Sequence, residues 1–433
     1  MLNQKISKTS KIFIALPLMD ELETVQSVMD SLCEQKVSNP VEVFVCVNQP
    51  DEWWNDEEKR LVCRNNMRTI RLLENGFTGS KIPLTIIDRF SPGSGWKGKQ
   101  HGVGWARKTV MDAIDKVAYG SDIIVSLDGD TTFGEHYLQS IADNIASNIH
   151  ATAIAVPYYH KLIGDEITDR CILRYEIYMR HYALNLWRIK SPYHFTALGS
   201  AMAIPVWAYR SIGGMTPQKS GEDFYLLQKL CKMGDVLTWN EEKVYPAARF
   251  SDRVFFGTGP AMIKGRDGDW SSYPVYDYRL FDEVLETYNS FEQLFIKDIP
   301  TPMTAILSEQ YKKDTLWEPL RKNVVTKERF IRACHQKVDG LRVLQYLKSR
   351  QNETEHNDEQ NLLEYFERFY PEESKTLNID FKQFSFKDSP VEELNRIRDF
   401  MVAEEEKCQK NTNYELQITS KQFNNTTVKQ RNI

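Results

Sequence analysis

Two aspartates, Asp128 and Asp130, are the residues whose type and spacing point most directly to chemistry. One glycine separates them in the run DIIVSLDGDTTF of residues 122–133. Carboxylates held this close repel one another unless a cation lies between them, and such oxygen ligands suit Mg²⁺ or Mn²⁺, which then bridges to substrate phosphates. The pattern therefore predicts a metal–diphosphate site. A surface Asp-Gly turn that closes a hairpin explains the same residues, and the local sequence leaves both interpretations open.

The segment before these aspartates predicts a buried strand. Residues 123–127 are apolar apart from Ser126 and are bounded by acids, which is typical of a strand buried on both faces of a parallel sheet. Asp128 and Asp130 would then lie beyond the carboxyl end of a central strand. Open α/β sheets bind their ligands at that edge.

Three strand–helix passages precede this strand. Buried strands are predicted at residues 12–17, 41–47 and 84–88, and each is followed by a segment with helical spacing of apolar residues. Such an alternation predicts an α/β fold with a doubly wound, mostly parallel sheet whose strand ends share one rim. The later elements expected are strands at 151–156, 236–239 and 244–248, with helices at 165–188 and 224–233.

Beyond about residue 262 the composition changes to amphipathic helices. One is predicted over residues 330–347, a second over 362–369 and a third over 394–401. The expected organisation is an α/β domain at 1–262, a helical C-terminal region at 263–408 and a disordered tail at 409–433. The helical appendage shows no pattern that suggests chemistry.

The composition and net charge of the chain exclude several classes of protein. The chain has 433 residues and a net charge of −5, from 55 basic and 60 acidic residues, so no strong field attracts nucleic acid. Its seven cysteines are scattered without a C-x-x-C pair, which predicts reduced thiols in the cytoplasm rather than disulfides or a zinc site. No run approaches 18 apolar residues, so we expect no transmembrane segment and a site of action in the cytosol or at a membrane surface.

Taken in order, five short motifs resemble a family-2 glycosyltransferase of the GT-A fold, over roughly residues 11–260. They are Ala15-Leu16-Pro17 with Glu21, Gly102-x-Gly104-x-Ala106-Arg107, Leu127-Asp128-Gly129-Asp130, Gly199 to Ile204 leading to Gly213-Gly214, and Gly221-Glu222-Asp223. The resemblance implies a Rossmann-like, mostly parallel sheet flanked by helices. It also implies an enzyme that moves a sugar from a nucleotide-diphosphate donor to an acceptor hydroxyl.

The resemblance assigns the donor side of the site to residues at the strand ends and in the basic loop. Asp130 and Asp128 would hold the Mg²⁺ or Mn²⁺ that offsets the growing charge of the diphosphate. The donor-binding residues it implies are Pro17, Asn48, Asp88, Lys97, Lys99, Arg107, Asp128, Asp130 and Arg253. For the two lysines and Arg107, a solvated basic loop and helix face is an equal alternative. Asn48 stands where an acid is common in the family, which leaves the choice of nucleotide open.

On the acceptor side, Asp223 is the candidate general base. Direct displacement requires the acceptor hydroxyl to lose a proton, and a single displacement inverts the anomeric carbon. Glu222 would contact the acceptor or orient the base. Both acids also fit the first turn of an ordinary helix, where they offset its dipole.

The sequence departs from the family pattern at one metal ligand. Many relatives supply a histidine after the acidic helix, but no histidine lies between residues 194 and 335. Asp252, or the diphosphate itself, is the remaining candidate for that position. The surrounding run, from Arg249 to Gly259, predicts either a loop that closes over the diphosphate or an ordinary salt-bridged connection.

Two rival functions remain. The D-x-D-x-T pattern also matches haloacid-dehalogenase-like phosphatases that use Mg²⁺, but there it closes the first strand, and the later Gly-Asp-x-x-x-Asp is missing here. A non-catalytic nucleotide-sugar-binding protein is the other alternative. A sugar-nucleotidyl transferase would need a glycine-rich N-terminal loop, where residues 15–22 read ALPLMDEL. The acceptor expected from the resemblance is a hydroxyl group of a glycan or of a polysaccharide precursor.

Overall fold

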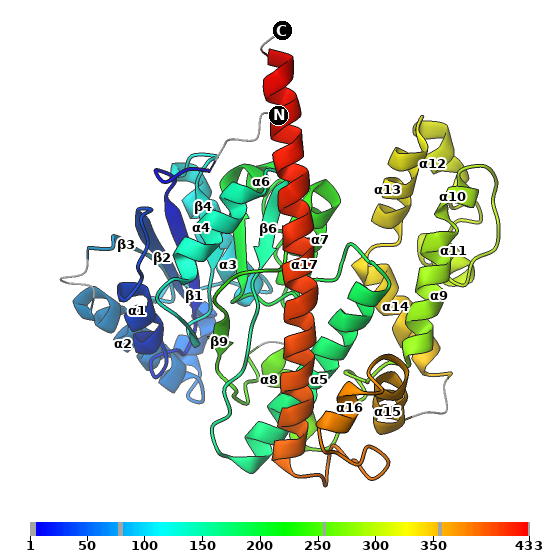
Figure 1. The fold of residues 1–433 in the computed structure, drawn as a ribbon. Helices are drawn as coiled ribbons and strands as arrows, with labels where there is room; N and C mark the ends of the chain where they lie inside the picture. Colours follow the sequence, from blue (N-terminus) through cyan, green and yellow to red (C-terminus); the bar gives the residue numbers. More distant parts are fainter. Residues whose placement is uncertain (1–5, 77–80, 254–256, 354–356, 432–433) are drawn as a thin grey trace. The chain divides into compact units, whose positions relative to one another are not determined.

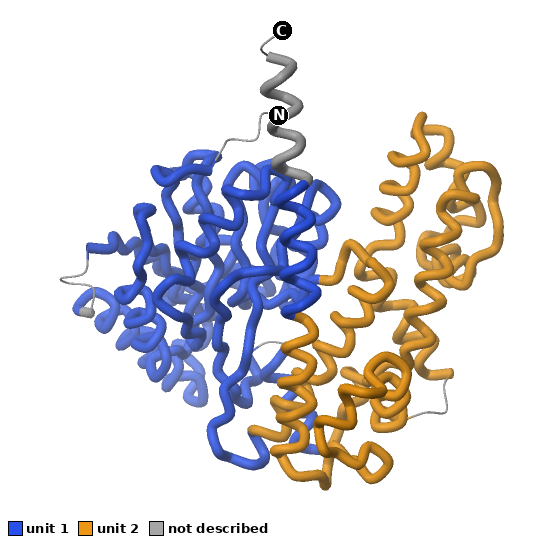
Figure 2. Tube along the Cα trace, viewed as in Figure 1, with its two compact units in different colours: residues 1–168, 195–267, 406–433 blue, residues 169–194, 268–405 orange. Residues whose placement is uncertain are grey.

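The structure is a computed structural model that describes residues 6–76, 81–253, 257–353 and 357–431, with side chains up to residue 418 (Figure 1). The chain divides into two compact units, shown in Figure 2. The α/β unit comprises residues 1–168, 195–267 and 406–433, and the helical unit comprises 169–194 and 268–405. The sequence placed residues 169–194 in the α/β domain. The structure groups them with the helical unit, because Tyr178 packs against Tyr273 and Tyr276 there.

A seven-stranded sheet with the order β3-β2-β1-β4-β7-β6-β8 forms the centre of the α/β unit (Figure 1). Its strands are β1 Ile12–Leu18, β2 Val41–Asn48, β3 Leu84–Arg89, β4 Ile123–Ser126, β6 Ala151–Ala155, β7 Met202–Pro205 and β8 Asp235–Leu237. All neighbours are parallel except β7, which runs antiparallel to both β4 and β6. The predicted fold class is therefore confirmed: an α/β fold with a mostly parallel central sheet, flanked by helices and followed by C-terminal helices.

The helices of the α/β unit follow the strands in alternation. They are the 3-10 turn η1 Asp51–Asn55 and the helices α1 Val25–Cys33, α2 Arg60–Gly76, α3 Val103–Val117, α4 Tyr137–Ser147, α6 Val206–Ser211, α7 Glu222–Met233 and α8 Thr258–Arg266. From β1 to β3 the chain moves in one direction across the sheet, and α3 then returns it past β1 to β4. Because such crossovers are right-handed, α3 lies on the face opposite α1 and α2, and it packs on β1 and β2.

The strand pairing decides which residues meet at the edge of the sheet. Ala15 in β1 is aligned with Ser126 in β4, so the residues after Ser126 emerge beside the end of β1. Directly after the two aspartates, β5 (Thr131–Phe133) pairs with β9 (Val244–Pro246) in a separate two-stranded sheet. Since Thr131 is aligned with Pro246, the segment after β9 is brought back to Asp130.

The helical unit contains α5 and the helices up to the first part of α17. Its elements are α5 Glu166–Arg188, α9 Tyr278–Asn289, α10 Phe291–Leu294, α11 Thr304–Tyr311, α12 Glu318–Asn323, α13 Lys327–Lys337, α14 Gly340–Gln351, α15 Asp358–Phe369, α16 Glu373–Thr376 and α17 Val391–Arg431. The helix predicted over 330–347 is in fact two, because Asp339 accepts a hydrogen bond from the Arg342 amide and caps a new helix. Residues 409–431, expected to be disordered, continue α17, and 432–433 lie outside the described residues.

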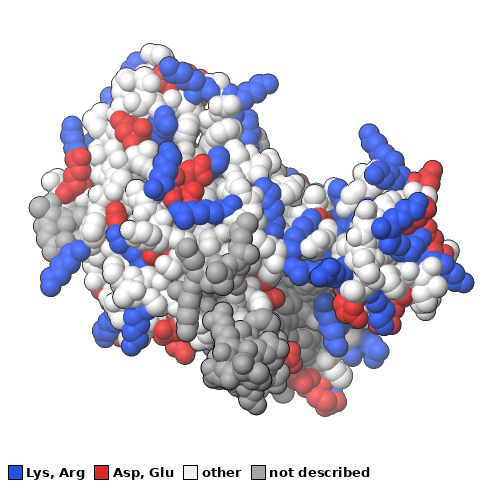
Figure 3. All heavy atoms as spheres, turned by 90° about the horizontal axis from the view of Figure 1, so that it is seen from above, with Lys and Arg blue, Asp and Glu red and all other residues white. Residues whose placement is uncertain are grey.

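No helix among the described residues is long and apolar enough to cross a membrane. On the face drawn in Figure 3, basic and acidic side chains are both present and interspersed. This agrees with the small net charge of −5.

Candidate active site

A single buried guanidinium, that of Arg107 in α3, holds two of the predicted site acids. Its Nη2 donates to Oδ1 of Asp128 at 2.8 Å, and its Nε donates to Oε1 of Glu222 at 3.1 Å. Its Nη1 donates to Ser126 Oγ at 2.6 Å and to the Gly199 carbonyl at 2.8 Å. Only 2% of the Arg107 side chain is exposed. The sequence left Arg107 either as a donor contact or as part of a solvated helix face, but in the structure it is buried and links Asp128 to the acidic corner.

Glycine at position 199 leaves the room that this guanidinium needs. A Cβ atom added to Gly199 would lie 2.2 Å from Nη2 of Arg107, closer than real contacts allow. Burial lowers the pKa of Arg107, but the charges of Asp128 and Glu222 outweigh that effect and raise the pKa above its usual value. Arg107 is therefore permanently charged, and each of its three nitrogens donates to a protein acceptor.

The acidic corner is the first turn of α7, which begins at Glu222 after Gly221 in a left-handed conformation, with φ of 77°. Glu222 is buried, whereas Asp223 is partly exposed and accepts a hydrogen bond from the Phe224 amide at 2.7 Å. Burial and the neighbouring charge of Glu222 raise the pKa of Asp223 to about 7, although Arg107 acts in the opposite direction. A carboxyl group with such a pKa can take up and release a proton near neutral pH.

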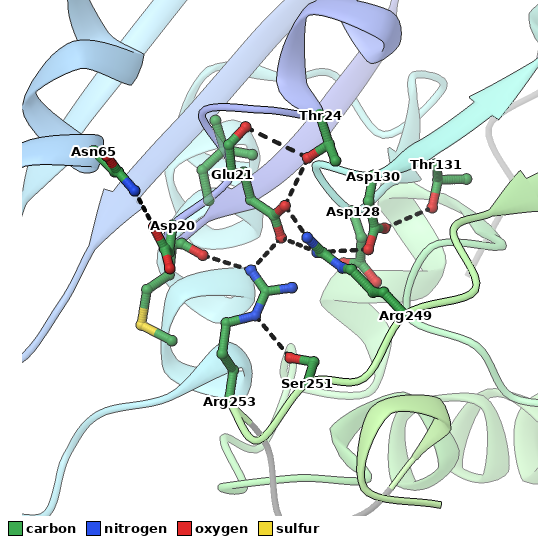
Figure 4. A network of polar contacts seen from close by, with 12 residues as sticks. Asp20, Glu21, Thr24, Asn65, Asp128, Asp130, Thr131, Arg249, Ser251 and Arg253 are labelled. Atoms are coloured by element: carbon green, nitrogen blue, oxygen red, sulfur yellow. Dashed lines mark hydrogen bonds and ion pairs between the residues drawn. The ribbon is translucent and has the colours of Figure 1, made fainter. Parts of the chain in front are cut away.

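Asp130 belongs to a second ion-pair network, drawn in Figure 4. Nη2 of Arg249 lies 2.6 Å from Oδ2 of Asp130, and the same nitrogen lies 2.6 and 2.8 Å from the two carboxylate oxygens of Glu21. Nη1 of Arg253 donates to Glu21 at 2.5 Å and to the Met19 carbonyl at 2.6 Å. Glu21 therefore forms ion pairs with both Arg249 and Arg253, and Arg249 also forms an ion pair with Asp130.

The two arginines do not fully offset the acids around Asp130. Burial and the charge of Glu21 raise the pKa of Asp130 to about 6, and Arg249 and Arg253 only partly lower it. Negative charge and carboxylate oxygens at the edge of a sheet suit a hard divalent cation. The Asp128–Asp130 pair thus fits Mg²⁺ or Mn²⁺, provided that Arg249 releases Asp130.

The structure offers no third protein ligand within the described ranges. Asp252, the candidate from the sequence, is exposed and makes no hydrogen bond or ion pair with a described residue. In that same part of the chain, no group of three or more His, Cys, Asp or Glu side chains is arranged to hold a metal. A cation here would depend on the two aspartates and on oxygens of the bound diphosphate.

Two of the predicted donor-binding residues, Asn48 and Asp88, form hydrogen bonds within the protein. Asn48 is buried, donates to the Leu18 carbonyl at 2.9 Å and accepts from Trp96 Nε1 at 3.1 Å. Asp88 accepts hydrogen bonds from the backbone amides of Phe90 and Ser91, each at 2.9 Å. Asn48 therefore ties β1 and the basic loop to β2, and Asp88 shapes the turn after β3.

Three other predicted donor residues lie at the same end of the sheet in different settings. Pro17 is buried in β1, aligned with Cys46 of β2. Lys97 and Lys99 are exposed, and within the described residues neither forms a hydrogen bond or ion pair that joins it to Asp128 or Asp130. The structure thus brings together Arg107, the aspartate pair and the acidic corner but leaves the lysines in solvent.

Sequence reasoning assigned no role to Arg249 or Glu21. Arg249 stands four residues before Arg253 in the same run, and Glu21 follows the first strand, so both lay inside motifs already noted. Their pairing spans 228 residues of sequence, and the alignments of β1 with β4 and of β5 with β9 together bring them to the same place. The available signal was the repeated arginine, whose partner the sequence does not indicate.

Comparisons with known proteins give structural likeness only. No profile of a protein family and no curated protein sequence matches the chain. Among solved structures, S. aureus TarS 1–349 in complex with UDP-GlcNAc has a TM-score of 0.38 and 11% identity, covering 90% of each chain. The mannosyltransferase PcManGT from Pyrobaculum calidifontis, in complex with GDP-Man and Mn²⁺, has a TM-score of 0.34 and 11% identity, covering 92% of this chain and 87% of its own. GalNAc-T7 with UDP, GalNAc and Mn²⁺ has a TM-score of 0.32 and 10% identity, covering 75% and 56%. All these TM-scores lie below 0.5, so the function proposed next depends on the site itself.

Proposed function

We propose that this protein transfers a sugar from a nucleotide-diphosphate sugar to an acceptor hydroxyl, with inversion at the anomeric carbon. One observation carries the proposal: Arg107 binds Asp128 and Glu222 through the same buried guanidinium. A donor site at the paired aspartates and a base at the acidic corner would thereby lie close to each other. The order of the sequence motifs supports the same assignment.

On the donor side, Asp128 and Asp130 would hold Mg²⁺ or Mn²⁺, which when bound offsets charge on the departing diphosphate. Arg253, with Lys97 and Lys99 from the exposed loop, would add positive charge around the phosphates. Arg107 has another task. Its nitrogens all donate to protein acceptors, so we assign it to positioning Asp128 and Glu222 rather than to contact with the donor.

On the acceptor side, Asp223 would act as the general base. Its carboxylate takes the proton of the acceptor hydroxyl while the oxygen forms a bond to the anomeric carbon, and the bond from that carbon to the diphosphate oxygen breaks. The raised pKa of Asp223 suits this proton transfer near pH 7. Glu222 is buried against Arg107, so it would orient the base and would not touch the acceptor.

The test is a panel of UDP-, GDP-, dTDP- and CDP-sugars, each with and without Mn²⁺ or Mg²⁺. A donor that binds the folded chain raises its melting temperature, and turnover releases the nucleoside diphosphate, which chromatography measures. We expect metal-dependent stabilisation by one class of donor and slow release of its diphosphate. Absence of stabilisation by every donor would overturn the proposal. Phosphate release from a generic phosphoester would favour the phosphatase, and binding without turnover would favour a non-catalytic binding protein.

A further inference from the structure

The position beside Asp130 where a metal would enter already holds a cation, the guanidinium of Arg249. This group lies 2.6 Å from Asp130 Oδ2 and bridges to both oxygens of Glu21 (Figure 4). The exposed fractions of the side chains are 28% for Arg249, 15% for Asp130 and 7% for Glu21. The bridge is therefore partly shielded from water, where an ion pair is stronger than at an open surface.

The backbone fixes both ends of this bridge. Asp130 immediately precedes β5, and Arg249 follows β9 by three residues, so the alignment of Thr131 with Pro246 sets the two side chains near each other. On the other side, a Cβ atom added to Gly129 would lie 2.7 Å from Glu21 Cγ, which shows how closely the turn between the aspartates rests on Glu21. The three charged groups are thus positioned by the fold and not by a flexible surface contact.

Glu21 is a second ion-pair partner for Arg249. It accepts hydrogen bonds from Arg249 through both of its oxygens, from Arg253, and from Thr24 Oγ1 at 2.8 Å. If Arg249 moves away from Asp130, its positive charge is still paired with Glu21. The movement therefore does not leave a partly buried guanidinium without a counter-ion. The Asp130 oxygen it releases is one that a divalent cation needs.

We propose that Arg249 is an internal counter-ion that competes with the divalent metal for Asp130, with Glu21 as the acid that retains Arg249 when the metal enters. This inference rests on the proposed function in one respect, the assignment of Asp130 as a metal ligand. Its consequence is that the nucleotide-free protein binds metal weakly. The affinity for metal is then set by an arginine that is not itself a ligand.

The experiment measures Mn²⁺ binding to the nucleotide-free, full-length chain by electron paramagnetic resonance of the free ion. Arg249→Gln removes the competitor, and we expect the dissociation constant for Mn²⁺ to fall at least about tenfold. Arg253→Gln is the matched control, because Arg253 carries the same charge and pairs with Glu21 but does not contact Asp130. We expect it to change the dissociation constant by less than about threefold.

A charge-conserving variant and a double-mutant cycle test the geometry. Arg249→Lys keeps the charge but replaces the guanidinium, whose Nη2 contacts both carboxylates, by an ammonium on a stem of different length. The affinity of this variant for Mn²⁺ should therefore lie between those of the wild type and Arg249→Gln. In a Glu21→Gln background, Asp130 is the only carboxylate of the described residues that remains in contact with Arg249. The increase in Mn²⁺ affinity caused by Arg249→Gln should therefore be larger in the Glu21→Gln background than in the wild type. The double-mutant cycle separates this difference from the general effect of losing a negative charge.

Several results would overturn the proposal. Unchanged or weaker Mn²⁺ binding in Arg249→Gln would show that Arg249 does not compete, and an equal gain in Arg253→Gln would show a general charge effect. If the effects of Arg249→Gln and Glu21→Gln on Mn²⁺ affinity were additive, Glu21 would not be the acid that retains Arg249. Circular dichroism and melting curves establish whether each variant is folded. If Arg249→Gln does not fold, Arg249→Lys still tests the proposal. Nucleotide binding is scored separately, so a chain that shows this competition but binds no donor would refute the glycosyltransferase and not the competition.

Discussion

Arg107 donates a hydrogen bond to Asp128 at 2.8 Å from a side chain that is only 2% exposed. The same guanidinium holds Glu222, which is 115 residues away in the sequence and is also buried. A buried charge that loses its partner is costly, whereas an ion pair replaced as a unit by apolar groups often is not. The stability of the α/β unit and the geometry of its candidate site therefore depend on the same ion pairs.

We expect Arg107→Met to lower stability by about 3–5 kcal/mol, because Glu222 would be left buried and unpaired. Thermal unfolding followed by circular dichroism measures the change. The matched control is Arg107→Met combined with Glu222→Leu, which removes both charges and should regain much of the loss. If the single variant melts like the wild type, the ion pair contributes little and Arg107 does not hold the corner together.

Replacing Asp130 by alanine should abolish the divalent-metal-dependent binding of a nucleoside diphosphate, because the carboxylate proposed to hold the metal is lost. Calorimetric titration of UDP and GDP, with and without Mn²⁺, measures this binding. Asp252→Ala is the comparison, since Asp252 is exposed and without a partner among the described residues, and we expect a much smaller effect there. Unchanged affinity in Asp130→Ala would exclude the aspartate pair as the metal site.

Asp223→Asn should leave donor binding intact while transfer falls at least about a hundredfold, the size of effect typical of a lost general base. Asparagine has nearly the same shape but cannot accept the proton. Donor affinity by melting-temperature shift and transfer rate by product chromatography separate the two quantities. A transfer rate close to that of the wild type would remove Asp223 from the mechanism.

The rate of transfer should increase with pH through about pH 7 and then level off, because Asp223 acts as a base only when it is ionised and its pKa is raised to about 7. A pH–rate profile with saturating donor measures this directly. A profile that is flat from pH 5 to pH 9 would contradict the assignment. If the rate decreased with pH over that range, the essential group would be an acid.

The same pKa predicts how stability changes with pH. The folded protein keeps Asp223 protonated up to about pH 7, whereas the unfolded chain ionises it near its ordinary pKa of about 4, so unfolding releases a proton between these values. The contribution of Asp223 to stability is therefore greatest below pH 4 and is lost as the pH rises toward 7. Melting temperatures of the wild type and of Asp223→Asn across this pH range test the direction of the change. The decrease in melting temperature that Asp223 causes should be absent in the variant.

Local patterns in the sequence were enough to predict the framework. The apolar run at 123–127 indicated a buried strand, and the D-x-D pair directly after it indicated a ligand-binding edge, because strand burial and strand-end chemistry depend on neighbouring residues. The strand–helix alternation fixed the mostly parallel sheet in the same way. The break between α13 and α14 was missed, since the apolar spacing continues across Asp339 and its cap is a single side chain.

Only the tertiary structure decided the partners of the charges. In the sequence Arg107 is one more basic residue of a predicted helix. In the structure it contacts Asp128 after β4, Gly199 before β7 and Glu222 at the start of α7. Arg249 reaches Glu21 across 228 residues because β1 pairs with β4 and β5 pairs with β9, and no local pattern encodes these pairings. The sequence by itself determined which chemical groups the sheet edge carries. Long-range strand alignment decided which of them are ion-paired to one another, since an ion pair depends on distance in space and not on spacing along the chain.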